Sequence, residues 1–197
     1  MLGRGRLDRS WVSEPGNLFA SALYPAPPAS LAPNAMSFAS ALAACDAVES
    51  VAGRSGLALK WPNDLLLDGK KVCGILLENF QTAFVSGIGI NVAHHPRDTR
   101  WPATHLAAHL PAVRLKAVFV ALMSAFANWY DLACARGFGP VREAWTERAF
   151  GIGRDVKVRS GGRVLAGRFI GLGKGGELVL RTKSSTIPIV AGDVEYG

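Results

Sequence analysis

Apolar residues recur at helical spacing in several segments before residue 150, and they alternate with polar residues after it. The helical spacing predicts helices at 36–51, 103–110, 115–136 and 140–149. Gly137 is a typical residue for a helix end, and Pro140 opens a helix where its missing N–H costs nothing. Short apolar runs predict strands at 57–61, 65–67, 72–77 and 83–92. The first part of the chain is therefore expected to be α/β (α+β), with a mixed β-sheet flanked by helices.

After residue 153 the period of the pattern is two. Short alternating segments, separated by glycine and serine turns, lie at 156–158, 164–172, 178–180 and 187–190. About five strands in so short a segment predict a small β-barrel. We therefore expect two domains, at 1–150 and 151–197.

Polar residues gather in the run Lys60-Trp61-Pro62-Asn63-Asp64. Pro62 forbids a helix and removes a backbone donor, and 65–67 follows as a short buried strand. Asp68-Gly69 strongly predicts a hairpin turn, with Lys70 and Lys71 directly after it at the edge of a buried strand. A lysine in that place either extends to water or faces an anion in a cleft, and the pattern leaves both open.

Two glycine-rich segments lie outside this hairpin. Gly3-Arg4-Gly5-Arg6 would let backbone N–H groups and guanidinium groups approach an anion, although a solvated surface turn has the same composition. The alternating glycines of Gly87-Ile88-Gly89-Ile90-Asn91 indicate a close approach to that strand, by a ligand or by a packed helix. Asn91 ends the strand, where a ligand would lie.

Composition narrows the class of protein. The chain is 49% hydrophobic and 19% charged, as in folded globular proteins. The longest uncharged run of the most apolar predicted helix, 117–130, is shorter than the roughly 18 residues that span a bilayer. No apolar run follows the N-terminal arginines, so a signal peptide is not predicted. We expect a cytoplasmic protein with no membrane partner.

Cysteine, histidine and charge content exclude further classes. The three cysteines are too few and too far apart for a disulfide framework or a zinc site, and His94-His95 has no third ligand at metal spacing. The net charge of +7 divides into +3 over 1–150 (14 minus 11) and +4 over 151–197 (8 minus 4). This suits an acidic partner, but the chain has no lysine-rich arm that would indicate nucleic acid.

Together these segments resemble the biotin protein ligase family, the biotin–[acetyl-CoA-carboxylase] ligases. The resemblance covers essentially the whole chain, and its most specific part is Lys60-Trp61-Pro62-Asn63-Asp64 with Lys71 and Gly74-Ile75-Leu76-Leu77-Glu78. Further matches are Gly3-Arg4-Gly5-Arg6, Trp11, Gly16-Asn17-Leu18, Gly87-Ile88-Gly89-Ile90-Asn91-Val92 and Ala191-Gly192-Asp193-Val194. The resemblance implies a catalytic domain of the biotin/lipoate ligase type, followed by an SH3-like barrel.

The resemblance also implies a reaction. Such ligases join biotin to ATP, with Mg²⁺, to give biotinyl-5′-AMP and pyrophosphate, and then transfer the biotinyl group to a lysine of the biotin carboxyl carrier protein, an acetyl-CoA carboxylase subunit. Two anions must meet in the first step, so positive groups aimed at the developing charge should supply most of the catalysis. No enzyme nucleophile is needed. A homodimer is compatible with the resemblance, whereas specific DNA binding is not expected because no helix-turn-helix segment is present in this chain.

Residue roles follow by the same resemblance. Lys71 would hold the biotin carboxylate against the α-phosphate, and Asp64 would orient this lysine or bind Mg²⁺. Arg4, Gly5 and Arg6 would close over biotin and the adenylate, with Arg6 counted among the catalytic residues.

The nucleotide would be bound by a second group of residues. Trp11 would pack on adenine, Lys60 would contact the phosphates, and Asn63 and Asn91 would form hydrogen bonds with the nucleotide.

The chain departs from the family at its start. Family members carry a further strand and helix before Gly3, with a Ser/Thr-Thr/Ser-Asn segment that contacts biotin, and a Gln-Thr pair where Met1-Leu2 stands here. We therefore expect weak or absent activity for this chain.

Three other readings remain. A lipoate or octanoate ligase, or a transferase acting through Cys73, would have the same fold, although a strand cysteine is usually a small buried hydrophobe. A non-catalytic pseudo-ligase would bind the carrier without adenylation. A nucleic-acid module on the basic barrel would bind DNA or RNA with a steep salt dependence.

Overall fold

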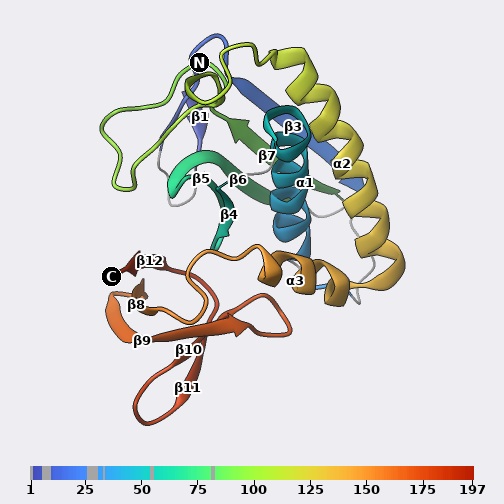
Figure 1. The fold of residues 1–197 in the computed structure, drawn as a ribbon. Coiled ribbons are helices and arrows are strands. Elements are labelled where there is room, and N and C mark those ends of the chain that lie inside the picture. Colours follow the sequence, from blue (N-terminus) through green and yellow to red (C-terminus); the bar gives the residue numbers. More distant parts are fainter. Residues whose placement is uncertain (1, 6–9, 26–30, 33, 54–55, 81–82) are drawn as a thin grey trace.

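The computed structural model contains helices on one side of a sheet, and a second sheet at the C-terminal end (Figure 1). It describes residues 2–5, 10–25, 31–32, 34–53, 56–80 and 83–197. The first sheet has the order β3-β7-β6-β5-β4 with antiparallel neighbours. Its strands are β3 (Leu18–Pro25), β4 (Leu57–Lys60), β5 (Asp64–Leu67), β6 (Lys70–Phe80) and β7 (Ala83–Ile90). The predicted hairpin turn is confirmed, since Asp68 and Gly69 both have positive φ, of 51° and 74°.

Helix α1 (Ala35–Ala52) is the centre of the core. It packs against β4 to β7 on one side and against the other two helices on the other. A helix that is enclosed on all sides must be apolar all round. Its alanines at 35, 39, 41, 43, 44 and 47 are at most 1% exposed, and their small side chains let the neighbouring elements approach closely.

Helix α2 (Leu115–Arg136) has the predicted bounds, but half of its apolar surface faces outward. Val118, Leu122 and Phe126 are buried, whereas Phe119 and Val120 are 43% and 57% exposed. Helix α3 (Phe138–Glu147) begins two residues before Pro140, and the helix expected at 103–110 is only a 3-10 turn, η2 (Leu106–Ala108).

Within the described residues, helices α1 and α2 are long and apolar enough to cross a membrane by length and composition, so the shortness of the run 117–130 does not by itself exclude a span. The continuous helix α2 includes charged residues at both ends, so its length exceeds the uncharged run. In α1 67% of the relevant window is buried inside the protein, and in α2 22%. The core helix of a soluble protein passes the same test, so this finding is weak support for a span.

The C-terminal sheet has the order β11-β10-β9-β8-β12. Its strands are β8 (Asp155–Ser160), β9 (Arg163–Leu172), β10 (Leu178–Arg181), β11 (Thr186–Ile189) and β12 (Asp193–Tyr196). The predicted five-strand count is confirmed, and β12 is the strand that lies outside the predicted ranges, although its four residues alternate between polar and apolar. A remaining pair, β1 (Leu2–Arg4) and β2 (Ser10–Val12), forms a separate two-stranded sheet.

Trp61 joins the two large sheets. Its side chain is 1% exposed, and its Nε1–H donates to the carbonyl oxygen of Gly176 at 3.1 Å. A cis peptide bond links Trp61 to Pro62. The connection between β4 and β5 is therefore attached directly to the turn between β9 and β10.

We expect Trp61→Phe to lower the free energy of unfolding by about 1–3 kcal/mol, because the smaller ring leaves a gap and Gly176 loses its donor. Urea denaturation measures this change. Val164→Ala, at a position that is 52% exposed, is the control and should change stability little. An unchanged urea midpoint for Trp61→Phe would refute the linking role.

Candidate active site

Lys71 and Asp64 form an ion pair where strands β5 and β6 meet. Lys71 Nζ lies 2.5 Å from Asp64 Oδ1, with side chains that are 26% and 14% exposed. The backbone of Lys71 is fixed by the loop after β7: its N–H donates to the Pro102 carbonyl at 2.7 Å, and its carbonyl accepts from the Thr104 N–H at 2.9 Å. The sequence left open whether these lysines extend to water or face an anion. Lys71 faces an anion, the Asp64 carboxylate, whereas Lys70 is exposed to water.

Trp11 covers the face of the sheet that α1 leaves open. Ile88 and Ile90 of β7 are buried toward α1, so the alternating Gly87 and Gly89 face the other way. A Cβ placed on Gly89 would lie 2.6 Å from the Trp11 ring, and one on Gly74 would lie 2.7 Å from it. The glycines therefore make room for an aromatic ring, which here is supplied by the chain itself.

The Trp11 ring also touches the charged pair. Lys71 Nζ lies 5.3 Å from its centroid, a cation–π distance. The indole Nε1 is buried without a hydrogen-bond partner among the described residues. A buried donor without an acceptor is costly, so this nitrogen is a natural contact for a ligand that enters beside Lys71.

Lys60 lies at the other end of the same hairpin and is 8% exposed. Its Nζ is 4.8 Å from the Trp101 ring centroid and 5.8 Å from that of Tyr196. Burial lowers the pKa of Lys60, and the charge of Asp64 acts in the opposite direction. Sequence patterns did not single out Trp101 or Tyr196, because both approach Lys60 from distant parts of the chain.

Asn63 and Asn91, which were predicted to bind the nucleotide, donate side-chain hydrogen bonds to backbone carbonyls in this structure. The Asn63 side chain donates to the Ile75 carbonyl, and the Asn91 side chain donates to the Thr104 carbonyl at 3.0 Å. Asn91 is 2% exposed. The amide nitrogen of each side chain is thus engaged, and among the described residues no hydrogen bond is donated to either side-chain oxygen.

Asn17 has a positioning role that the sequence did not reveal. Its Oδ1 accepts from the N–H groups of Val92, Ala93 and His94 at 2.9, 2.9 and 3.0 Å. Its Nδ2 donates to the His94 carbonyl at 3.0 Å. This one side chain fixes the exit of β7 directly after Asn91.

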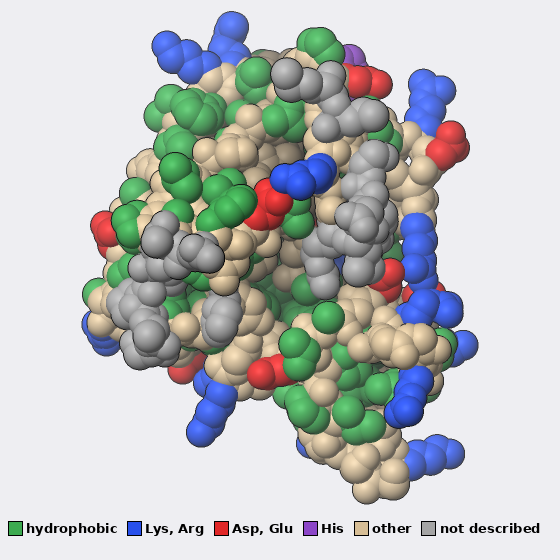
Figure 2. All heavy atoms as spheres, turned by 180° about the vertical axis from the view of Figure 1, so that it is seen from behind, with side chains coloured by type: hydrophobic (Ala, Val, Ile, Leu, Met, Phe, Trp, Pro, Cys, Tyr) green, Lys and Arg blue, Asp and Glu red, His purple; other side chains and the backbone are tan. Residues whose placement is uncertain are grey.

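The arginine loop is only partly described. Arg4 pairs with Glu78 of β6 at 2.9 Å, and its side chain is 78% exposed. Gly5 is partly buried beside it. Arg6 lies outside the described residues. On this side of the molecule, Figure 2 shows a hollow between the larger body and the barrel, with charges of both signs at its margin.

Cys73 is unsuited to act as a nucleophile. It is fully buried, burial raises the pKa of its thiol, and the Sγ donates to the Gly74 carbonyl. A reactive cysteine needs an exposed thiolate with a lowered pKa. The transferase reading through Cys73 therefore loses its support.

The four histidines of the chain all lie in the loop after β7. His95 and His105 face each other with their Nδ1 atoms 2.6 Å apart, and His109 contacts Asp68 at 3.5 Å. No group of three metal-binding side chains occurs within the part of the chain that the structure covers. Burial, and then the neighbouring His95, His94 and His109, lower the pKa of His105 below its ordinary value of 6.5.

This lowered pKa predicts a pH dependence of stability. The unfolded state binds more protons than the folded state between the lowered pKa and 6.5, so the stability contribution is lost as pH falls through this window. We expect the melting temperature to fall between pH 7.5 and pH 5.5, and His105→Gln to reduce that fall. His94→Gln, at an exposed position, should change it less. Equal slopes for the native chain and His105→Gln would count against this assignment.

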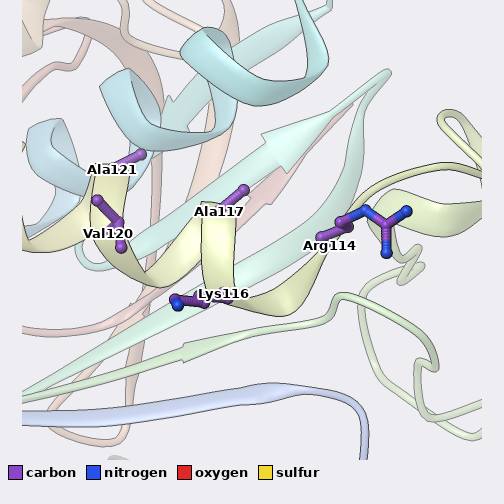
Figure 3. A pocket seen from close by; sticks show the side chains of 5 residues that line it. All are labelled: Arg114, Lys116, Ala117, Val120 and Ala121. Carbon is purple, nitrogen blue, oxygen red and sulfur yellow. The ribbon is translucent and has the colours of Figure 1, made fainter.

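A hollow at the start of helix α2 lies apart from these residues. It has a volume of about 520 Å³, is shallow, and is lined by Arg114, Lys116, Ala117, Val120 and Ala121 at the start of α2 (Figure 3). None of these lining residues belongs to the Lys71 site. The site itself is filled by Trp11 and by the Lys71–Asp64 pair.

Comparison with known proteins identifies the class. Residues 2–94 match the family model described as the Biotin/lipoate A/B protein ligase family, and residues 151–197 match the Biotin protein ligase C terminal domain. The fold and site thus define a protein ligase of the biotin and lipoate type.

Full-length similarity is more specific. The chain is 35% identical to the biotin--[acetyl-CoA-carboxylase] ligase of Paracoccus denitrificans, over 99% of this chain and 86% of that protein. It is 30% identical to the bifunctional ligase/repressor BirA of Bacillus subtilis, of which it spans 63%. The biotin protein ligase from Aquifex aeolicus, solved in complex with biotin and ATP, superposes with a TM-score of 0.86 at 25% identity, covering 99% of this chain and 84% of that one. The chain belongs to the biotin protein ligase family.

Proposed function

We propose that the protein is an ATP-dependent biotin–[biotin carboxyl carrier protein] ligase. It forms biotinyl-5′-AMP and pyrophosphate from biotin and ATP, and it transfers the biotinyl group to a lysine of the carrier. The observation that carries this proposal is Lys71, held 2.5 Å from Asp64 at the glycine-lined face of the sheet in a chain of this family.

Lys71 is suited to the first step. The biotin carboxylate attacks the α-phosphorus of ATP, and the bond from that phosphorus to the leaving pyrophosphate breaks. Both reactants are anionic, and an ammonium group beside them stabilises the charge that grows on the phosphate oxygens. When the substrate anions contact Lys71, Asp64 keeps the lysine in place from the opposite side. The carrier lysine then attacks the mixed anhydride directly, and AMP leaves.

The remaining assignments rest on the family pattern and on position. Arg4, Gly5 and Arg6 close over biotin and the adenylate, and Trp11 exchanges its contact with the glycines for adenine. A closed loop excludes water from the mixed anhydride. Lys60 contacts the phosphates, and Asn63 and Asn91 use their free side-chain oxygens toward the nucleotide.

Mg²⁺ enters with ATP. Asp64 is the carboxylate that would hold it, and the ion would neutralise phosphate charge. Asp64 is 14% exposed and already pairs with Lys71, so one protein ligand with phosphate and water oxygens fits this position better than a full protein site.

The acceptor is the biotin carboxyl carrier protein of acetyl-CoA carboxylase, in the cytoplasm. We retain the division into a catalytic domain at 1–150 and an SH3-like domain at 151–197, which the matches at 2–94 and 151–197 support, and the basic charge of the second suits an acidic carrier. A homodimer remains a prediction. Strand β3 is an edge strand with exposed Phe19 and Leu23, and analytical ultracentrifugation tests whether two copies pair.

The test is a single-turnover reaction in which the enzyme is in excess over ATP and in which biotin and Mg²⁺ are supplied. Biotinyl-AMP is measured by mass spectrometry. Formation of the adenylate supports the proposal. Lipoyl-AMP formed from lipoate, with no product from biotin, would replace it with the lipoate ligase reading. Carrier binding without any adenylate would replace it with the pseudo-ligase reading. A rate equal to that of the Paracoccus denitrificans ligase would overturn the expectation of weak activity.

A further inference from the structure

Lys60 is a buried cation that forms no ion pair with a carboxylate of the described residues. Lys60 is 8% exposed, and no carboxylate oxygen of the described residues lies within 4.0 Å of its Nζ. Lys71, in contrast, is paired with Asp64. A buried charge normally requires a partner, so the surroundings of Lys60 need an explanation.

Two aromatic faces take the place of the carboxylate. The Trp101 and Tyr196 ring centroids lie 4.8 and 5.8 Å from Lys60 Nζ. The two rings stand edge to face, 5.7 Å apart with 76° between their planes. Phe150 supports both, at 6.0 Å from Trp101 and 4.9 Å from Tyr196. We call Trp101 and Tyr196 the aromatic pair.

Contacts with the hairpin turn and with strand β12 hold the segment that carries Trp101. Trp101 Nε1–H donates to the Gly69 carbonyl of the hairpin turn at 3.0 Å. Arg100, the residue before it, bridges to the barrel strand β12 through Asp193 at 3.1 Å and through Glu195. Thus the loop after β7 and the barrel are fastened together beside Lys60.

Tyr196 is fixed from its own side. A Cβ on Gly151 would lie 2.1 Å from the Tyr196 ring, and Gly151 has a φ of +85°, so this close approach requires glycine. The Tyr196 hydroxyl is buried and has no hydrogen-bond partner among the described residues. The contact that Tyr196 makes with Lys60 in this structure is through its ring.

Aromatic faces have a consequence that a carboxylate would not have. They attract an ammonium group through the ring quadrupole and leave its N–H donors and its full charge for another anion. A carboxylate would compete with that anion. Burial lowers the pKa of Lys60, and the charges of Asp64 and Asp193 act in the opposite direction. The ring faces add an attraction for the ammonium group.

We propose that Trp101 and Tyr196 are positioning residues that hold the Lys60 ammonium ready for a polyphosphate, so that the C-terminal barrel forms part of the phosphate site. The anion is the triphosphate chain of the nucleotide or the pyrophosphate that leaves. This inference rests on the proposed function for the identity of the anion. The inference adds that Tyr196 contributes to the affinity for this anion.

Binding of inorganic pyrophosphate to the full chain, measured by isothermal titration calorimetry, tests the inference without requiring turnover. Trp101→Leu and Tyr196→Leu should each weaken binding by roughly 5- to 10-fold. Tyr196→Phe keeps the ring and should bind within about twofold of the native chain, since the hydroxyl it removes makes no hydrogen bond. Circular dichroism checks the fold of each variant, and Trp101→Phe is the milder substitute if Trp101→Leu does not fold.

A Lys60→Met background separates positioning from a general structural role. There, Tyr196→Leu should cause no further loss of pyrophosphate affinity, as expected for a coupled pair. An equal loss in both backgrounds would overturn the proposal, as would absence of pyrophosphate binding by the native chain.

Steady-state adenylation gives a second readout. Tyr196→Leu should raise the KM for ATP and leave the KM for biotin unchanged, and equal changes in both would also overturn the proposal. The two hypotheses fail separately. A native chain that binds pyrophosphate through Lys60 but forms no adenylate contradicts the proposed function alone, and a native chain that forms adenylate while Tyr196→Leu has no effect contradicts the aromatic pair alone.

Discussion

Lys71→Met is expected to slow the formation of biotinyl-AMP by about 100- to 1000-fold, the usual effect of removing one group that stabilises developing negative charge. Methionine keeps much of the length and apolar character of the side chain but carries no charge. Asp64 would then lie beside the incoming anions without its partner, which adds repulsion to the lost attraction. Single-turnover adenylation, measured against the native chain, gives the ratio.

The preceding residue provides a matched control for this substitution. Lys70 is the same residue type in the same strand, but it is exposed and points away from Asp64. Lys70→Met should leave the rate within about twofold, because exposed charges contribute little. Equal losses for the two variants would mean that only the net charge of the hairpin matters, and the assignment of Lys71 would fail.

Gly89→Ala is expected to raise the KM for ATP by roughly 10-fold, since an added methyl group would lie 2.6–2.8 Å from three atoms of the Trp11 indole. Such distances are far below van der Waals contact, so Trp11 must leave the sheet face. An aromatic contact contributes about 1 kcal/mol to binding, and both the nucleotide and the Trp11 indole would lose their contact with the glycine-lined face of the sheet. This loss is of the size that the expected rise in KM requires. Initial rates at varied ATP concentration measure the change.

Gly87→Ala tests whether the effect is specific to the Trp11 contact. Gly87 is on the same strand and face, two residues away, and its nearest neighbour to an added Cβ is the Leu76 carbonyl oxygen at 3.5 Å, an ordinary contact. This variant should keep the native KM. If Gly87→Ala is as impaired as Gly89→Ala, the loss comes from the strand and not from Trp11.

The local part of this site was predictable from sequence. The hairpin turn at Asp68-Gly69 is determined by residues next to each other, and both adopt the positive φ that the dipeptide favours. The turn brings Lys71 opposite Leu66, but a register shift between Leu65 and Leu66 places Asp64 opposite Gly74. The link between Lys71 and Asp64 therefore came from the family resemblance and not from the turn. The bounds of α2 were also predictable, since Gly137 ends the helix.

Contacts between distant segments could not be predicted in this way. Trp101 lies in a loop and Tyr196 at the chain end, and neither segment has a period that indicates a partner for Lys60. Helical spacing shows that Phe119 and Phe126 lie on an apolar surface, but it does not show which one a neighbour covers; Phe126 is buried and Phe119 is 43% exposed. For the same reason Asn63 and Asn91 look like ligand contacts in sequence, although their amide nitrogens hold backbone carbonyls in the fold.

The contact of Asn17 with the exit of β7 has a consequence for hydrogen exchange. The amides of Val92, Ala93 and His94 belong to no strand, yet all three donate to the same side-chain oxygen. Their exchange with solvent deuterium should therefore be slow and should accelerate together when Asn17 is replaced by alanine. Opening of this turn is thereby tied to a residue 75 positions earlier in the chain, at the entrance to β3.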